Sequence, residues 1–345
     1  FHVLPRLLRF LFFLPFTLTT AWAGEENGLV PKLDAAVGKA AGFMESIIFY
    51  SREVGGQSLP IVLVILGGTA IFLTIYFKFI NLRSIGLAFR TARGKYTDKD
   101  APGQITHFQA LTAALSATVG LGNIAGVAVA VGHGGPGATF WMIFMGFCGM
   151  TKKFCECTLG VKYREIDQTG RVHGGAMYYL SRGLKEKGRA WGGLGRGLAI
   201  FFAFMCIGGA LGAGNMFQVN QATEQVMSSF GFFGGNTLVF GVLLAILVGL
   251  VIIGGIVWIA RVTSFLVPFM CAIYVLAALA IIFSNLDKLG DAFVQIFTSA
   301  FSPMAVSGGF VGVLIQGIKR AAFSTEAGIG SAPIAHSAVK TKKPA

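Results

Sequence analysis

Two stretches of the chain, 208 residues apart, carry the same pattern of small and polar residues. Residues 113–123 read AALSATVGLGN and residues 321–331 read AAFSTEAGIGS, so both follow A-A-[LF]-S-x-x-x-G-[LI]-G-[NS]. Glycines allow a helix to unwind, and unwinding leaves backbone N–H and C=O groups without helical partners. Freed N–H groups can bind a carboxylate, and freed carbonyl oxygens can bind sodium. The sequence therefore predicts two helix interruptions that hold a small charged molecule and a cation.

Each interruption supplies glycines and polar side chains as candidate ligands. Glu326 is the most informative, because an ionisable side chain in an apolar segment is costly and by default indicates function. Two roles stay open for it: a ligand of sodium or of a substrate amine, or an ion pair with Lys319 or Arg320 that holds the broken helix. For the glycines, close helix packing is the alternative. The candidates for substrate and sodium binding are Thr118, Gly120, Gly122, Asn123, Ser324, Thr325, Glu326, Gly328 and Ser331.

The segments around these stretches have the composition of an all-α membrane protein. Only 12% of the residues are charged, 54% are hydrophobic, and the mean hydropathy is +0.70. A soluble chain carries about twice that share of charge. A membrane-spanning helix needs about 20 apolar residues. Seven such segments are present: 59–77, 108–131, 134–151, 197–223, 237–260, 262–285, and a last one from about 308 to 330.

The basic residues lie in alternate loops between these segments. They concentrate at 78–99, at 152–196, at Arg261 and in the tail, whereas the intervening loops hold one lysine, Lys288. Cytoplasmic loops of membrane proteins carry the excess of lysine and arginine. The net charge of +13 is thus explained by orientation in a membrane, and nucleic acid is not expected as a partner.

This orientation makes the two matched stretches run in opposite directions through the membrane. Gly-interrupted segments at corresponding positions of two halves are typical of inverted-repeat transporters with broken helices. We therefore expect a first five-helix repeat at 107–285, the start of a second at 306–335, and an extra helix at 59–80 within a transporter domain, 59–345. On this interpretation the chain is truncated after the first helix of the second repeat.

The N-terminal region is expected to direct the chain to the membrane. Arg6 and Arg9 precede an apolar run, and residues 21–23 read AWA, which is typical of a signal-peptide cleavage site. Residues 1–24 are therefore interpreted as a signal peptide, with an uncleaved signal anchor as the alternative. Residues 25–58 would then form an extracytoplasmic segment.

Several motifs resemble the alanine or glycine:cation symporter family, also called the sodium:alanine symporter family. They are GQITHFQAL at 103–111, ATVGLGNIAG at 117–126, GGPGA at 134–138, GGAMYY at 174–179 and FSTEAGIGSAP at 323–333. The resemblance covers about residues 55–340. The chain departs from the family at Thr325, where Asn is common, and a hydroxyl can still ligate or hydrogen-bond there.

The resemblance implies a leucine-transporter-like fold, with the segments at 108–131 and 308–330 as its broken helices. It implies a symporter, not an enzyme, that imports alanine or glycine with sodium, or alternatively with protons, across the bacterial inner membrane. No cofactor is implied beyond the coupling ion. In this fold the third core helix often lines the substrate pocket, although ordinary helix–helix hydrogen bonds would explain the same residues. The candidates for this lining are Asn215, Gln218 and Asn220.

Other classes of protein remain as alternatives. The chain could be an inactive truncated transporter fragment, since a sodium site of this fold also uses a later core helix. A channel or a non-transporting membrane sensor is a second alternative. The paired interruptions disfavour a channel, and the sequence shows no soluble signalling domain that would favour a sensor. The sequence contains no nucleophile–base arrangement and no phosphate-binding loop.

Overall fold

The computed structural model describes most of the chain after the N-terminal region. The expected signal peptide, 1–24, and most of the expected extracytoplasmic segment lie outside the described residues. The structure describes residues 38–39, 42, 46, 50–54, 57–98, 100–230, 237–302 and 309–343.

The first of two compact units contains a pair of short strands, β1 (Ser51–Val54) and β2 (Gln57–Pro60), within the described residues. The Ser58 hydroxyl donates to the Ser51 hydroxyl at 2.6 Å, and the Ile61 N–H donates to the Tyr50 carbonyl at 3.0 Å. These strands, and a second short pair further on, are an exception to the expected all-α architecture. Helix α3 (Ile61–Tyr76) begins directly after β2.

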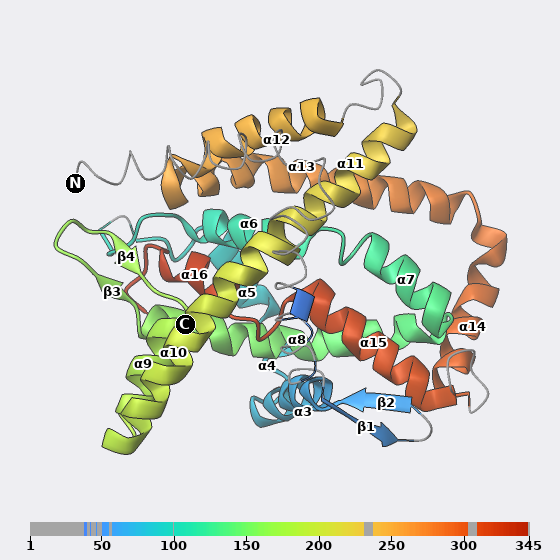
Figure 1. The fold of residues 1–345 in the computed structure, drawn as a ribbon, viewed down its shortest axis with the longest axis horizontal. Coiled ribbons are helices and arrows are strands. Elements are labelled where there is room, and N and C mark those ends of the chain that lie inside the picture. The colour runs from blue at the N-terminus through green and yellow to red at the C-terminus, as the bar shows by residue number, and fades with distance from the viewer. Residues whose placement is uncertain are drawn as a thin grey trace. The chain divides into compact units, whose positions relative to one another are not determined.

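The second unit holds the remaining described elements, which are mostly helical (Figure 1). Helix α3 ends where Lys78 and Phe79 adopt left-handed φ angles of 51° and 56°. The expected extra helix, 59–80, is therefore shorter than the apolar run that predicted it. In chain order the other elements are α4 (Ile80–Arg83), α5 (Ile85–Ala92), α6 (His107–Thr118), α7 (Ala125–Gly134), α8 (Gly137–Lys162), β3 (Glu165–Ile166), β4 (Val172–His173), α9 (Ala176–Lys185), α10 (Arg189–Leu211), the π-helical η1 (Gly212–Met216), α11 (Phe217–Ser229), α12 (Thr237–Ile252), α13 (Gly255–Phe283), the 3-10 helix η3 (Leu286–Lys288), α14 (Leu289–Phe301), α15 (Gly309–Thr325) and α16 (Ala332–Ser337).

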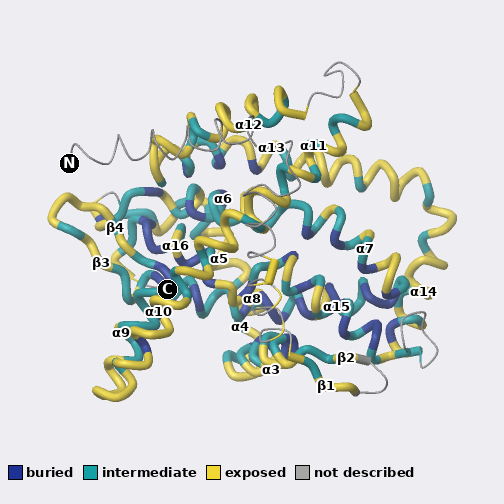
Figure 2. Tube along the Cα trace, in the orientation of Figure 1, coloured by how far each residue is buried: buried dark blue, intermediate teal, exposed yellow. Residues whose placement is uncertain are grey.

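Helix α8 is the element against which both halves of the second broken segment pack, with α15 and α16 alongside it (Figure 1). Small residues permit this approach. A Cβ added at Gly160 of α8 would lie 2.8 Å from the Cβ of Pro333 in α16. Figure 2 shows buried residues along α8, α15 and α16. The helix also extends eleven residues beyond the expected segment, 134–151, and so carries Lys152, Lys153 and Glu156 along these neighbours.

Two long apolar helices lie mostly exposed (Figure 2). The continuous helix Arg189–Ser229 and helix α13 are long and apolar enough to cross a membrane, and only 6% of the most apolar window of each is buried. At 1.5 Å per residue, the 29 residues of α13 span about 43 Å, more than the roughly 30 Å hydrocarbon core. Their exposed apolar faces suit a lipid environment.

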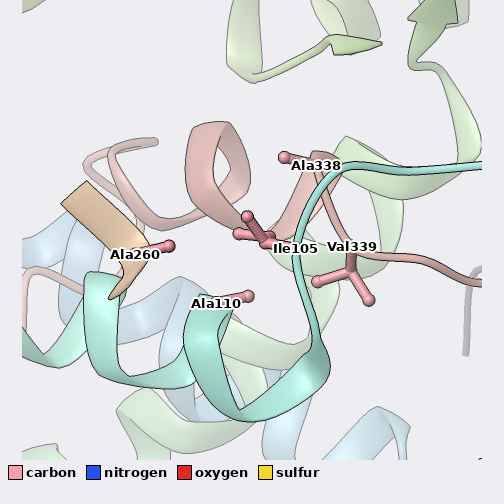
Figure 3. Close-up of a cluster of buried hydrophobic side chains, with 5 residues drawn as sticks. All are labelled: Ile105, Ala110, Ala260, Ala338 and Val339. Atoms are coloured by element: carbon pink, nitrogen blue, oxygen red, sulfur yellow. The ribbon is translucent and has the colours of Figure 1, made fainter. Parts of the chain in front are cut away.

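A buried cluster joins the start of the first broken segment to the end of the second (Figure 3). Ile105 and Ala110 lie before and within α6, and Ala338 and Val339 follow α16. Ala260 of α13 completes the cluster, and each of the five side chains is at most 3% exposed. These apolar contacts position the entrance of one interruption beside the exit of the other.

Candidate functional site

The first predicted interruption is present between α6 and α7. Helix α6 ends at Thr118 and α7 begins at Ala125, so the glycines lie in a non-helical segment. The Asn123 side-chain amide donates to the Thr118 carbonyl at 2.9 Å, which holds the two ends of this segment together. The N–H groups of Gly120 and Gly122 donate to no acceptor in the described part of the chain. They are therefore available to a ligand.

The second predicted interruption lies between α15, which ends at Thr325, and α16, which begins at Ala332. Three of its residues have left-handed φ angles: Glu326 at 50°, Gly328 at 87° and Gly330 at 85°. Glycine adopts this conformation freely, whereas a glutamate held there is strained by about 1–3 kcal/mol. The segment is thus a fixed, partly strained turn rather than a simple gap in the helix.

Two backbone groups of the second interruption bind side chains of α8. The Gly330 N–H donates to Glu156 Oε2 at 3.2 Å, and Lys153 Nζ donates to the Glu326 carbonyl at 3.2 Å. Lys153 Nζ and Glu156 Oε1 are 3.6 Å apart. Glu156 is only 6% exposed, so its charge depends on these partners. The Lys153–Glu156 ion pair of α8 therefore stabilises the turn at 326–331.

The Glu326 carboxylate has a partner within its own turn. Ser331 Oγ donates to Glu326 Oε2 at 2.8 Å. Among the described residues, Glu326 forms no ion pair with Lys319 or Arg320, which was the structural role considered from the sequence. The structural alternative therefore takes a different form, in which Ser331 and Glu326 close the turn. The ligand role of Glu326 remains a prediction.

The two interruptions are in direct contact. The Ser324 hydroxyl hydrogen-bonds the side-chain oxygen of Asn123. A Cβ added at Gly122 would lie 3.0 Å from the Cα of Ser324, so glycine is the residue that lets the two backbones approach. The chain thus brings together two segments that are 201 residues apart.

Of the three residues expected to line the pocket, the structure brings one to the interruptions. Gln218 of α11 accepts a hydrogen bond from the Leu121 N–H at 3.4 Å through its Oε1 atom. Asn215 lies exposed in the π-helical turn, and Asn220 is exposed and donates to Glu224 at 3.2 Å. Gln218 is therefore the member of this group that faces the candidate site.

The remaining candidates lie in the two interruptions but bind their own helices. Thr118 Oγ1 donates to the Ala114 carbonyl at 3.0 Å, and Thr325 Oγ1 donates to the Ala321 carbonyl at 2.8 Å. Each hydroxyl oxygen keeps lone pairs that can accept a further bond or ligate a cation. Both residues stand at the last turn of a helix that leads into an interruption.

Sequence reasoning missed two contributors to the site. One is Glu156, although an acidic residue beside an apolar segment is itself a signal of function. Tyr274 of α13 was not considered, and its hydroxyl donates to the Asn123 carbonyl at 3.5 Å. A tyrosine within a long apolar helix gives no spacing pattern that would reveal such a contact.

The chain matches the sodium:alanine symporter family over residues 41–345. It is 46% identical over 286 residues to the sodium/alanine symporter AgcS of Methanococcus maripaludis, with 83% of this chain and 61% of the relative covered. It is 35% identical to the putative sodium/proton-dependent alanine carrier protein YrbD of Bacillus subtilis, with 83% and 56% covered. It is 33% identical to the probable sodium/glutamine symporter GlnT of Bacillus subtilis, and the match covers 87% of this chain and 60% of the relative.

The chain spans about three-fifths of the length of these curated relatives. The match nevertheless includes both interruptions, α8, and the helices that contact them. The expected resemblance is confirmed, as is the expectation that the family is one of transporters rather than enzymes. The chain belongs to the sodium:alanine symporter family of membrane transporters.

Proposed function

We propose that the protein imports a small neutral amino acid, alanine or glycine, together with sodium by alternating access. The observation that carries this proposal is the contact between the two interruptions at Asn123 and Ser324. Unwound helices that meet in this way offer backbone N–H groups to a carboxylate and carbonyl oxygens to sodium at one place. The family match and the name of the relative AgcS support alanine and sodium as the transported pair.

The satisfied and unsatisfied groups suggest how the ligands are divided. The Gly330 N–H already donates to the carboxylate of Glu156. The N–H groups of Gly120 and Gly122 have no partner among the described residues. The substrate carboxylate is therefore assigned to the first interruption. Sodium is assigned to the oxygens beside the contact, supplied by Thr118, Asn123, Ser324 and Thr325.

The proposed architecture is a leucine-transporter-like inverted repeat in a multi-pass protein of the bacterial inner membrane. Its first repeat is 107–285, the second begins at 306–335, and the extra helix at 59–80 stands outside both. The proposal is supported by the position of both interruptions and by the basic loops between apolar helices. In alternating access, the two repeats rock about the site so that it opens to one side at a time.

The test is uptake of labelled alanine by vesicles that contain the full-length protein. We expect accumulation against a gradient when sodium is higher outside, and little when potassium replaces sodium. Glycine and glutamine as competitors define the substrate, and a pH gradient without sodium tests proton coupling. Downhill flux that needs no ion gradient would favour a channel, and binding without flux would favour a sensor. Activity of a longer protein but not of residues 1–345 alone would identify this chain as an inactive fragment.

Glu326→Gln tests the candidate ligand in the same assay. The amide keeps the shape and can still accept the bond from Ser331, but it removes the charge available to sodium or to the substrate amine. We expect sodium-dependent uptake to fall about tenfold or more, with a raised sodium requirement. Glu186→Gln, at an exposed position after α9, is the matched control. Unchanged uptake and unchanged sodium dependence in Glu326→Gln would exclude the ligand role.

A further inference from the structure

Arg164, which follows the last residue of α8 by two positions, binds four backbone carbonyl groups through its guanidinium group. Its Nη1 atom donates to Ser337 O at 2.8 Å and to Val339 O at 2.6 Å. Its Nη2 atom donates to Pro102 O at 3.0 Å and to Thr341 O at 2.7 Å. A planar guanidinium carries five N–H donors in a fixed fork, so it can join several acceptors that a lysine could not reach together.

These carbonyls belong to two segments that are far apart in the sequence. Residues 102–106 lead into α6, and residues 337–341 leave α16. The two segments pair as a parallel β-bridge between Ile105 and Val339, and the Lys340 N–H donates to the Ile105 carbonyl at 2.9 Å. A Cβ added at Gly103 would lie 2.5 Å from Lys340 N, so the backbones are in close contact.

The connection runs to both interruptions of the candidate site. The first segment continues through α6 to Thr118, and the second comes directly from α16 and the turn at 326–331. Any movement that separates the entrance of α6 from the exit of α16 must break the bonds of Arg164 to one side. The buried apolar cluster in Figure 3 joins the same two ends and would also resist this movement. Apolar contacts are not directional, so the cluster alone does not fix how the ends are oriented.

The positive charge of Arg164 is compensated by backbone carbonyl oxygens. The residue is partly buried, and among the described residues it forms no ion pair with a carboxylate. Its burial partly excludes water and lowers the pKa of its guanidinium group from the ordinary value. Carbonyl oxygens are therefore its main counter-dipoles, and losing them would leave a poorly solvated cation.

We propose that Arg164 is a latch that holds the cytoplasmic ends of the two broken helices together and must release one of them for the site to open inward. The name Arg164 latch is used for this guanidinium group with the carbonyls of Pro102, Ser337, Val339 and Thr341. The inference rests on the proposed alternating access and extends it to a residue outside the substrate and sodium site. Arg164 is a positioning residue, because it acts through the ends of α6 and α16.

A peripheral ion pair joins the same two segments. Lys342 Nζ lies 2.6 Å from Asp98 Oδ2, and both side chains are exposed. Exposed pairs of this kind contribute little individually. We therefore assign the main resistance to opening to Arg164, and the Asp98–Lys342 pair supplies a mild variant for comparison.

The first experiment measures opening without measuring transport. Ser337 is 1% exposed, and its carbonyl is one of the four that bind Arg164. The variant Ser337→Cys places a thiol there, and the cysteine side chain is nearly the same size as that of serine. A membrane-impermeant maleimide is added from the cytoplasmic side. The labelling of the five native cysteines is measured without Ser337→Cys and is subtracted as background. We expect Arg164→Ala to raise the labelling rate about tenfold or more, because charge-assisted hydrogen bonds are lost. Arg164→Lys should give a smaller rise.

Arg171→Ala is the matched control, since it removes a basic side chain from an exposed position of the loop after α8. It should label at the rate of the unaltered protein, and Lys342→Ala should rise only slightly. Equal labelling rates in Arg164→Ala and Arg171→Ala would overturn the latch. This readout does not depend on uptake, so a protein that fails to transport would still test the latch separately from the proposed function.

A second experiment keeps Arg164 and closes the latch covalently. Ile105→Cys with Val339→Cys places two thiols on partners of the parallel bridge, where backbones lie about 4.8 Å apart and a disulfide can form. We expect oxidation to stop alanine uptake, alanine binding from outside to persist, and reduction to restore uptake. Full uptake by the crosslinked protein would show that these segments do not separate during transport.

Discussion

Glu156 shows how one side chain can support a site without lying in it. Its carboxylate accepts the Gly330 N–H and pairs with Lys153, which in turn binds the Glu326 carbonyl. The turn between α15 and α16 exposes backbone groups that hydrocarbon could not satisfy. The protein supplies partners for two of them from the neighbouring helix, and these contacts stabilise the unwound conformation.

Replacing Glu156 tests this support. Glu156→Ala leaves the Gly330 N–H and the Lys153 ammonium group without their partner, and we expect a loss of about 3 kcal/mol in unfolding free energy. Glu156→Gln keeps an acceptor for Gly330 and should lose less. Thermal unfolding in detergent, followed by helical circular dichroism, measures both. Glu165→Ala, at an exposed position, is the control. Equal unfolding temperatures for the three variants would show that the turn does not depend on Glu156.

At the scale of elements, the two interruptions differ in how they are held. The first is tied by Asn123 to its own helix end, whereas the second contains three left-handed residues and is tied to α8. They meet because Gly122 has no side chain at the point of contact. The geometry of the site thus depends on the spacing between two helix ends.

Gly122→Ala should therefore separate the interruptions. Its Cβ would lie 3.0 Å from Ser324 Cα and 3.2 Å from Phe323 Cδ1, and backbone cannot move aside as a flexible side chain can. We expect alanine affinity to fall about tenfold, measured by equilibrium binding, with a stability loss of about 1–3 kcal/mol. Gly132→Ala in α7 meets open space and should bind alanine normally. Normal binding by Gly122→Ala would refute the importance of this contact.

The loop between β3 and β4 gives a pH-dependent prediction at the same scale. The Thr169 hydroxyl, which donates to Asp167 at 2.7 Å, is the main cause that lowers the pKa of this carboxyl from 3.8 to about 2. Because the folded pKa is lowered, the stabilisation is present above pH 3.8 and is lost as pH falls through about 2.

Amide hydrogen exchange at Arg171, whose N–H donates to Asp167 at 2.8 Å, reports the state of this loop. Protection should remain constant from pH 7 to 4 after correction for intrinsic exchange, and should decline below pH 3. In Asp167→Asn, which cannot ionise, protection should lack this acidic decline. A decline centred near pH 4 in the unaltered protein would contradict the lowered pKa.

At the scale of the whole molecule, apolar faces and basic loops together support the proposed orientation in a membrane. Helices α12 and α13 and the long helix that precedes them expose isoleucine, leucine and phenylalanine side chains. The basic loops between helices lie at alternate connections. In a lipid bilayer these apolar faces contact hydrocarbon, so their exposure carries no hydrophobic free-energy penalty. The loops rich in lysine and arginine are then expected on the cytoplasmic side.

Two introduced cysteines, each labelled above the background of the five native cysteines, test this orientation in intact cells. Asp287→Cys, between α13 and α14, should react with an impermeant maleimide added outside. Thr169→Cys, between β3 and β4, should react only after the membrane is permeabilised. Both positions are exposed in the structure, so a difference in labelling reports the side of the membrane. The opposite labelling pattern would invert the proposed topology.

The sequence predicted those parts of the site that depend on local conformation. Paired glycines at 120 and 122, and at 328 and 330, located both interruptions, because glycine at such spacing weakens a helix wherever it occurs. The family was likewise identified from short motifs. Boundaries were less accurate: α8 continues through Lys152, Lys153 and Glu156, since charged residues remain good helix formers beyond the apolar run.

Contacts between distant segments could not be predicted in the same way. The sequence contains no signal that Gln218, rather than Asn215 or Asn220, meets the first interruption, since all three are polar residues on one helix. Nor could it reveal that Arg164 binds carbonyl groups, because backbone acceptors exist at every residue. These interactions follow from tertiary packing between segments that are distant in the sequence.

The choice of Gln218 has a cause in the π-helical turn at Gly212–Met216. There the Phe217 N–H donates to the Gly212 carbonyl, five residues back, so this turn contains one residue more than an α-helical turn. One residue corresponds to a rotation of about 100° around a helix axis. Without the additional residue, the same side chain would be directed about a quarter-turn away from Leu121. One additional residue in this turn thus sets which polar side chain of the helix meets the first interruption.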